Sequence, residues 1–338
     1  MIAPIAWSTP PSHYGPWERV TSLITEGLVK KGVEVTLFAT ANSHTAGKLH
    51  AVCPRGYEED PEIDPKVYEY LHLSEVFEHA HQFDLLHNNF DFMPLAFSRL
   101  VSTPMVTTIH GFSSPKILAV YEKYNGHCHY VSISDADRAS TLDYIATIYH
   151  GIDIENFVFN DKPEDYLVFF GRIHHDKGAR EAIEIARRCK KPLVLAGIIQ
   201  DEAYYRTHVE PHLNDEIRYI GSVGPEKRNE ILGKALALLH PINFDEPFGL
   251  SVIEAMACGT PVIAFPKGSM PEIIEPGKNG FLPGTIDEAV AAVKQLSTLS
   301  RQACRQTVEE RFTQDRMVEN YLSVYEKILR KHKRHEAR

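Results

Sequence analysis

The stretch His240–Phe281 reads HPINFDEPFGLSVIEAMACGTPVIAFPKGSMPEIIEPGKNGF, and it indicates the fold class of the whole chain. Its pattern predicts a strand, a glycine-bearing loop, a helix, a second strand, and then another loop and helix. Phe248-Gly249-Leu250 marks the turn into the first helix, and Gly259-Thr260-Pro261 marks the exit from it. Strands that alternate with helices in this way form a parallel sheet covered by helices.

Two glutamates, Glu246 and Glu254, lie eight residues apart within this stretch. Pro247 and Gly249 between them place Glu246 in the loop and Glu254 on the helix, so the two carboxylates can face different parts of one ligand. The helix N-terminus beside them favours an anion, because its backbone N–H groups and its dipole both point at the ligand. Carboxylates repel a phosphate but accept hydrogen bonds from hydroxyls. The two glutamates beside this helix N-terminus therefore indicate a ligand that contains a sugar. A surface charge is the alternative for Glu254, but its apolar surroundings predict a buried carboxylate with a partner.

Length and composition restrict the class of protein. The chain has 338 residues, 43% hydrophobic and 24% charged, which fits a soluble globular protein of two domains. Its net charge of -9 argues against nucleic acid as a main partner. The five cysteines are scattered, which favours reduced thiols in the cytoplasm over disulfides or a zinc site. No apolar run approaches the roughly 20 residues that span a bilayer, and the N-terminus lacks a signal-peptide pattern.

The same alternation extends along the chain. In the first half we expect strands at 1–6, 33–38, 84–87, 104–109, 129–133 and 145–149, helices at 16–31, 65–81 and 134–138, and irregular structure at 42–63. In the second half we expect strands at 166–170, 192–196, 217–220 and 235–239, helices at 177–189, 201–212 and from 225, and three helices to finish the chain. The first strand carries Pro4, which indicates a shortened edge strand or a start codon placed a few residues late.

These elements predict an α/β protein with two doubly wound halves of about 150 residues each, joined by a polar linker at 150–165. Ligands of such sheets bind outside the carboxyl ends of the strands, and two halves that face each other form one cleft. The residues expected there are 8–15, 87–89, 110–111, 171–172, 221 and 244–249.

The segment GRIHHDKG, residues 171–178, places two cations at a strand end and at the start of the next helix. Arg172 and Lys177 over a helix N-terminus can hold a diphosphate and stabilise it as it leaves. The alternative for Arg172 alone is a surface salt bridge, but the combination with Lys177 and the Glu246 stretch favours the diphosphate. Because no D-x-D pair lies at a strand end, we expect a site that works without a metal.

Four further features give weaker signals. His110 ends an apolar strand, so it is either at the floor of the cleft or a core histidine bonded to the backbone. Gly15 could let the backbone approach a phosphate. The other histidines match no metal motif. The basic tail at 327–338 fits a frayed last helix, or weak attraction to anionic lipid at about 1 kcal/mol per basic residue.

Taken together, the motifs resemble the retaining glycosyltransferases of family 4, which have the GT-B fold, over nearly the whole chain. The E-x7-E stretch from Glu246 to Glu254 carries most of the resemblance, and GRIHHDKG is similar to the family's G-R-x4-K-G element. The segment at 10–39 resembles the subgroup with a Y-G-G-x-E-R pattern, and TTIHGF and YVSISDADR match as well. The resemblance implies two facing Rossmann-like domains with a cleft between them. They are 1–150, completed by a last helix at 313–334, on the acceptor side, and 151–312 on the donor side.

The resemblance also assigns roles to residues. Arg172 and Lys177 would bind the donor diphosphate, and Glu254 would bind the ribose hydroxyls. The donor sugar and phosphate would be held by Glu246 and the backbone amides of Phe248, Gly249 and Leu250. His110 would lie beside the transferred sugar, Gly15 would approach the phosphates from the other domain, and Gly197 with the loop 222–224 would lie near the base.

One position departs from the family pattern, because Pro16 replaces the second glycine of the N-terminal loop. Proline has no N–H, so either a phosphate contact is lost or the acceptor loop is remodelled. The expected activity is metal-independent transfer of a hexose from a UDP- or GDP-sugar to an acceptor hydroxyl, with retention of the α configuration and no cofactor. The acceptor would be a small molecule, a glycan or a lipid-linked group.

Other activities remain open at this point. They are a sugar phosphorylase, a nucleotide-sugar epimerase, or a non-catalytic nucleotide-sugar sensor, an alternative that Pro16 keeps open. A dehydrogenase is disfavoured, since no G-x-G-x-x-G follows the first strand.

Overall fold

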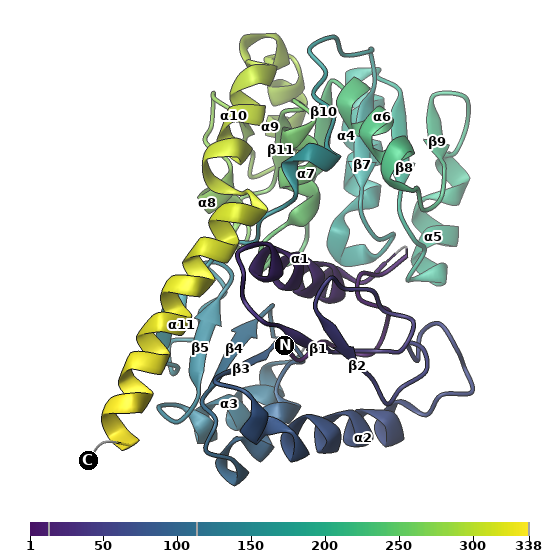
Figure 1. Cartoon of the computed structure of the whole chain (residues 1–338). Coiled ribbons are helices and arrows are strands. Elements are labelled where there is room, and N and C mark those ends of the chain that lie inside the picture. Colours follow the sequence, from purple (N-terminus) through teal and green to yellow (C-terminus); the bar gives the residue numbers. More distant parts are fainter. Residues whose placement is uncertain (13, 113, 337–338) are drawn as a thin grey trace. The chain divides into compact units, whose positions relative to one another are not determined.

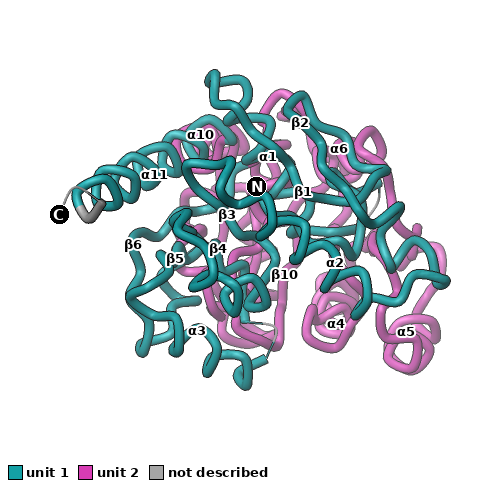
Figure 2. The backbone as a smooth tube through the Cα atoms, turned by 60° about the horizontal axis from the view of Figure 1, so that its bottom comes forward, with its two compact units in different colours: residues 1–151, 314–338 teal, residues 152–313 magenta. Residues whose placement is uncertain are grey.

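The computed structural model describes residues 1–338 except 13, 113 and 337–338. It is an α/β protein in which parallel strands alternate with helices (Figure 1), as predicted. The chain divides into two compact units (Figure 2): Met1–Gly151 with Gln314–Arg338 form unit 1, and Ile152–Thr313 form unit 2.

Unit 2 is built on one parallel sheet of six strands in the order β12-β11-β10-β7-β8-β9. The chain starts at β7 in the middle, runs outward through β8 and β9, and returns to β10, β11 and β12 on the other side. This is the doubly wound order, so the loops after β7 and β10 meet where the order reverses, which is the place where ligands of such sheets bind. The strands are β7 (Leu167–Phe170), β8 (Leu193–Ala196), β9 (Ile217–Tyr219), β10 (Ala237–His240), β11 (Val262–Ala264) and β12 (Gly280–Phe281).

Helices cover the sheet of unit 2 and bury its apolar strands. All four residues of β8 and of β10 are buried, as a strand covered on both faces requires. The helices are α4 (Ala179–Cys189), α5 (Glu202–His208), α6 (Pro225–Lys234), α7 (Leu250–Ala257), α8 (Met270–Ile273), α9 (Ile286–Val293) and α10 (Arg301–Arg311).

Unit 1 has a second parallel sheet. Its strands β3 (Leu86–Asn88), β4 (Met105–Ile109), β5 (His129–Ser132) and β6 (Tyr144–Thr147) pair in sequence order, and β1 (Thr36–Phe38) pairs with β2 (Lys48–His50). Ile2 joins the two groups, because it bridges to Phe38 on one side and to Asn88 on the other. The helices of this unit are α1 (Pro16–Lys30), α2 (Pro65–Glu78), α3 (Leu118–Tyr124) and α11 (Gln314–Glu336).

The last helix, α11, returns to unit 1 and packs there (the yellow helix in Figure 1). Gln314 donates a hydrogen bond to the Leu23 carbonyl at 2.7 Å, which fixes its first turn against α1. Farther along, the Tyr325 hydroxyl lies 2.6 Å from His87 Nδ1 on β3. Among the described residues, no helix, α11 included, has the length and apolar character needed to cross a membrane.

Several local predictions in unit 1 were wrong. No helix forms at 134–138; Ser134 accepts a hydrogen bond from the Asp137 amide at 3.2 Å, but the chain makes only a turn before β6. One cap cannot offset the cost of starting a helix when no apolar helical stripe follows it. Residues 1–6 form no regular strand, and within them only Ile2 forms β-bridges, since Pro4 has no amide to continue the ladder.

Other elements were not predicted. The strand β2 lies within 42–63, which we expected to be irregular, and α3 and the 3₁₀ helix Met93–Leu100 were missed. β2 has only three residues, so its alternation is too short to stand out from a polar loop. Its pairing with β1 comes from tertiary contact rather than from local propensity.

A buried carboxylate in the first turn of α1 gives unit 1 a testable pH dependence. Glu18 is 3% exposed, and burial raises its pKa from 4.5 to about 7. As the pH rises from 4.5 to 7, the unfolded carboxyl loses its proton while the folded one keeps it. The stability linked to protonated Glu18 is therefore complete below pH 4.5 and is lost as the pH rises through 7.

We expect Glu18→Gln to gain stability over the wild type as the pH rises from 5 to 8, by up to about 3 kcal/mol. Glutamine keeps an acceptor for the Trp7 amide, which lies 3.3 Å from the Glu18 carboxylate. Denaturant unfolding at several pH values measures the difference. Glu26→Gln, on the same helix, is the matched control, and an equal pH slope in both variants would contradict the assignment.

Candidate functional site

The loop that leaves β7 carries the two predicted cations of unit 2. Arg172 lies two residues past the end of β7, and its guanidinium donates to Gln200 Oε1 in the loop after β8. The chain then makes a 3₁₀ turn, His175–Lys177, and enters α4 through Gly178. This turn puts Lys177 at the start of α4, as predicted, and on the carboxyl side of the sheet. Both cations therefore lie where the strand order of the unit 2 sheet reverses, which is its switch point.

Lys177 forms an ion pair with Glu246, which lies in the loop after β10. Their Nζ and Oε2 atoms are 2.5 Å apart, and the side chains are only 14% and 10% exposed. The Lys177 ammonium also lies over the Phe244 ring, 4.6 Å from its centroid. The structure thus brings together the cation of GRIHHDKG and the first glutamate of E-x7-E, two residues that are 69 positions apart in the chain.

The surroundings of Glu246 keep it ionised. Burial alone would raise the pKa of this carboxyl, but the nearby His240 imidazole and the charge of Lys177 lower it from 4.5 to about 2. His240 Nε2 lies 3.4 Å from Glu246 Oε2. Burial also lowers the pKa of the His240 imidazole. At neutral pH the site therefore presents a carboxylate acceptor beside a primary ammonium.

The N-terminus of α7 opens next to this pair. Gly249 is the N-cap, and its φ of 92° lies in the left-handed region that favours glycine. Phe248 before it is 2% exposed and packs edge-on against Phe312, so this loop is anchored in the core. Leu250 begins the helix, and the Val252 amide donates to the Gly249 carbonyl at 3.0 Å, so the amides of Leu250 and Ser251 are the ones that precede the helical hydrogen bonds. An anion at this position would meet those amides and the positive end of the helix dipole.

Glu254 lies on α7 and is 4% exposed, as its apolar surroundings predicted. Its Oε1 is 3.5 Å from Nη1 of Arg228, which comes from α6. Arg228 is itself 8% exposed, and its guanidinium lies 4.3 Å from the centroid of the Phe157 ring. The second glutamate of the motif is therefore a buried charge with a buried cation as its partner.

Gly197 directly follows β8 and lies next to the loop that leaves β7. A Cβ atom built on Gly197 would lie 1.9 Å from the Gly171 carbonyl oxygen, so no other residue fits without a backbone shift. Its own carbonyl accepts a hydrogen bond from the Tyr219 hydroxyl at 2.7 Å. Gly197 therefore lets the loops after β7 and β8 approach each other closely.

His110 lies in unit 1, at the carboxyl end of β4. It is 7% exposed and stacks on Trp17 with 5.6 Å between the ring centroids. Its Nε2 donates to Asn89 Oδ1 at 2.9 Å, and its Nδ1 lies 3.4 Å from His150 Nε2. Burial lowers the pKa of His110 to about 3, so the ring is neutral at physiological pH. It can serve as a hydrogen-bonding group but not as a cation.

Gly15 is the N-cap of α1, also in unit 1, and Pro16 occupies the first helical position. Proline is favoured there, because the N–H that it lacks would have no partner within the helix. The loop before Gly15 includes residue 13, which lies outside the described residues.

Several side chains of these sites were missed in the sequence. They are Gln200, Arg228 and His240 in unit 2, and Trp17 and His150 in unit 1, whereas Phe244 and Asn89 lie in the predicted segments 244–249 and 87–89. His240 lies at a strand end, so that position could have identified it. Arg228 gives no such signal, because an arginine among the charged residues of α6 looks like a solvated helix face.

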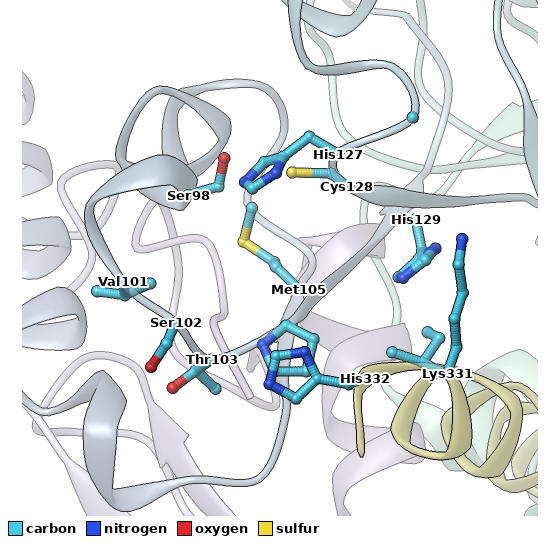
Figure 3. A pocket seen from close by; sticks show the side chains of 13 residues that line it. Ser98, Val101, Ser102, Thr103, Met105, His127, Cys128, His129, Lys331 and His332 are labelled. Atoms are coloured by element: carbon cyan, nitrogen blue, oxygen red, sulfur yellow. The ribbon is translucent and has the colours of Figure 1, made fainter. Parts of the chain in front are cut away.

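A separate cavity of about 230 Å³ lies at the opposite edge of the unit 1 sheet (Figure 3). Thr103, Met105 and His129 line it from the amino ends of β4 and β5, and Lys331 and His332 line it from α11. His110 is at the carboxyl end of β4, so the cavity is at the other end of the strand. Because ligands of such sheets bind outside the carboxyl ends of the strands, this cavity is distinct from the site predicted for catalysis.

Two α/β units with these sheets define the GT-B fold, and solved structures agree. A sucrose-phosphate synthase from Thermosynechococcus elongatus superposes with a TM-score of 0.80 at 18% identity, and the match covers 98% of both chains. AviGT4, a glycosyltransferase involved in avilamycin A biosynthesis, gives 0.71 at 23% identity, over 98% of this chain and 97% of that one. HepE from Anabaena, in complex with UDP and glucose, gives 0.71 at 18% identity, over 92% and 95%. At these identities the likeness concerns the fold.

Family models identify the chain more closely. Glycosyl transferases group 1 matches residues 153–311, and Glycosyltransferase Family 4 matches residues 17–156. The protein belongs to glycosyltransferase family 4.

Curated relatives agree with this family. N-acetyl-alpha-D-glucosaminyl L-malate synthase from Bacillus anthracis is 31% identical over 127 residues, which cover 35% of this chain and 32% of that protein. D-inositol 3-phosphate glycosyltransferase from Mycolicibacterium smegmatis is 27% identical over 172 residues, covering 45% and 38%. The matches thus span about a third of the length of these two relatives.

Proposed function

We propose that the protein transfers a hexose from a UDP- or GDP-sugar to an acceptor hydroxyl, with retention of the α configuration and without a metal ion. Family membership supports glycosyl transfer, and the similar structure of HepE was solved in complex with UDP and glucose and with UDP-glucose. The acceptor is a small molecule, a glycan or a lipid-linked group. Nucleic acid is not a partner in this proposal, which agrees with the net charge of -9.

The observation that carries the proposal is the buried Lys177–Glu246 pair at the switch point of unit 2. The two side chains are only 14% and 10% exposed. Burying both charges costs desolvation free energy, and their mutual attraction offsets only part of that cost. A ligand with a phosphate and hydroxyl groups would use both members, since the ammonium binds the phosphate and the carboxylate accepts from a sugar hydroxyl. The N-terminus of α7 offers further donors to the same phosphate.

The proposed reaction needs no protein nucleophile. The bond between the sugar's C1 and the diphosphate oxygen breaks, and the acceptor oxygen bonds to C1 on the same face. The acceptor's proton passes to the leaving phosphate oxygen. Arg172, Lys177 and the first-turn amides of α7 stabilise the charge that grows on the diphosphate. Glu246 holds the sugar through its hydroxyls, and His110 is a neutral hydrogen-bonding group.

We assign the ribose hydroxyls to Glu254, with Arg228 holding that carboxylate in place. Glu254→Ala and Arg228→Met are expected to raise the donor KM about 10- to 100-fold, because each removes or misplaces a charged acceptor. The turnover number should change much less. Arg228→Lys should recover part of the loss, since it keeps the positive charge. Steady-state kinetics with varied donor separates the two constants, and a lower kcat at unchanged KM would refute this role.

A ligand screen followed by a transfer assay tests the whole proposal. Thermal denaturation with UDP-, GDP- and ADP-sugars should show one strongly stabilising donor. Incubation with that donor should release nucleoside diphosphate only when an acceptor is present, and EDTA should not reduce the rate. Acceptor-independent turnover would instead indicate an epimerase, and dependence on inorganic phosphate a phosphorylase. Strong binding without turnover would indicate a sensor, the alternative that Pro16 at the start of α1 keeps open.

The proposal includes a cytoplasmic setting. All five cysteines are free, which fits a reducing compartment. Weak contact of the basic tail with anionic lipid remains part of the proposal, with residues 337–338 of that tail outside the described residues.

A further inference from the structure

Three metal-binding side chains meet in unit 1, apart from every residue assigned above. His50 ends β2, Glu75 lies in the last turn of α2, and His79 caps the same helix four residues later. One ligand atom from each residue lies within 4.8 Å of those of the other two. The spacing of four puts Glu75 and His79 on one helix face, whereas His50 is 25 residues away in sequence. Only the fold shows the cluster, because no sequence motif spans that separation.

Both histidines lie near the same carboxylate oxygen, and His79 Nδ1 also donates to the Glu75 main-chain carbonyl at 2.9 Å. Glu75 Oε1 lies 2.7 Å from His50 Nε2 and 3.5 Å from His79 Nδ1, and the two rings are 5.0 Å apart. Ligand atoms around a tetrahedral zinc ion, each bound at about 2.0–2.1 Å, lie about 3.3 Å from one another. Small side-chain rotations would therefore bring all three atoms to bonding distance of one ion.

The environment suits a metal ligand set. The three side chains are 26%, 28% and 33% exposed, so water can reach a fourth coordination position. On its inner side the His50 ring packs against Phe38 with 4.8 Å between centroids, which limits its orientation. An imidazole, imidazole and carboxylate set favours zinc and similar transition metals over magnesium or calcium, which prefer oxygen ligands.

We propose that His50, Glu75 and His79 bind a zinc ion that ties the edge strand β2 to the C-terminal end of α2. β2 has three residues and pairs only with β1 among the described strands, so its position depends on few hydrogen bonds. The ion adds a cross-link between elements that are joined by the long segment 51–64. The site is structural and does not take part in the proposed sugar transfer.

Zinc titration of the metal-stripped full chain tests the proposal. Calorimetry should show a zinc site that Glu75→Gln and His50→Gln each weaken about 100-fold or more, since outer-shell changes alone cost 10- to 100-fold. His81→Gln, an exposed histidine two residues past His79, is the matched control and should bind as the wild type does. A second group of side chains that could bind a metal consists of His174, His175 and Asp176. Asp176→Asn removes one of its ligands, so that zinc bound at that group can be counted separately.

A structural readout completes the test. Zinc should raise the thermal midpoint of the wild type and slow amide exchange in Lys48–His50, and neither effect should appear in Glu75→Gln. If Glu75→Gln fails to fold without metal, as circular dichroism would reveal, His50→Gln carries the comparison. The proposal is overturned if the wild type shows no saturable zinc binding, or if both ligand variants bind zinc as tightly as the wild type.

Discussion

Arg172→Ala is expected to lower kcat for sugar transfer by about 10²- to 10³-fold, with a smaller change in the donor KM. The guanidinium lies at the carboxyl end of β7 and is oriented by Gln200. The negative charge on the diphosphate increases as the sugar leaves, so a fixed cation there stabilises the transition state more than the bound donor. Steady-state kinetics with a saturating acceptor measures both constants.

Two comparisons make the Arg172 result specific. Arg172→Lys should recover only part of kcat, because an ammonium keeps the charge but loses the planar pair of donors. Arg180→Ala, which removes an exposed arginine from α4, should leave both constants unchanged. Full activity in Arg172→Ala would remove Arg172 from the proposed mechanism. A loss confined to KM would reassign it to donor binding.

Lys177→Met is expected to cause the largest combined loss, in stability as well as in activity. It removes a cation from the diphosphate site and leaves the Glu246 carboxylate buried beside His240 without its ammonium. Breaking a buried ion pair from one side costs about 3–5 kcal/mol. The turnover number should fall by at least the factor expected for Arg172→Ala. Denaturant unfolding and kinetics on the same preparation give the two numbers.

The double variant Lys177→Met/Glu246→Gln separates the two losses. With no charge left to bury, stability should return most of the way to that of the wild type, while activity should stay low. If the double variant is as unstable as Lys177→Met alone, the buried-charge explanation is wrong. If it regains activity, the pair is structural and the diphosphate assignment fails.

The pH dependence of the Lys177→Met stability loss follows from Glu246. Its folded pKa of about 2 lies below the ordinary 4.5, so the paired carboxylate contributes stability above pH 4.5. The wild type loses that contribution as the pH falls from 4.5 to 2. The difference in free energy of unfolding between the wild type and Lys177→Met should therefore be largest near neutral pH and should narrow below pH 4.5.

The sequence predicted the elements with strong local signals. α1 begins at Pro16, α7 follows Gly249, and Glu254 is buried on that helix, because proline, glycine and an apolar helical pattern each restrict the backbone locally. The apolar strands β4, β8 and β10 were also placed within two residues of their bounds. By contrast, β2 and the turn at Ser134 depend on neighbours that local propensity does not describe.

The sequence by itself determined the class of the protein. Alternating strands and helices, together with the E-x7-E and G-R-x4-K-G elements, indicated a parallel α/β fold and the family to which the chain belongs. These signals are local, since each lies within a few turns of backbone and needs no distant partner.

Tertiary structure alone decided which side chains are partners. Lys177 meets Glu246 across 69 residues, Arg228 meets Glu254 from another helix, and His50 reaches Glu75 from an edge strand. Ion pairs and hydrogen bonds depend on distances of a few ångströms, and the path of the chain between distant residues sets those distances. The charge state of Glu246 and the cluster around Glu75 therefore became visible only once the sheets had brought these residues together.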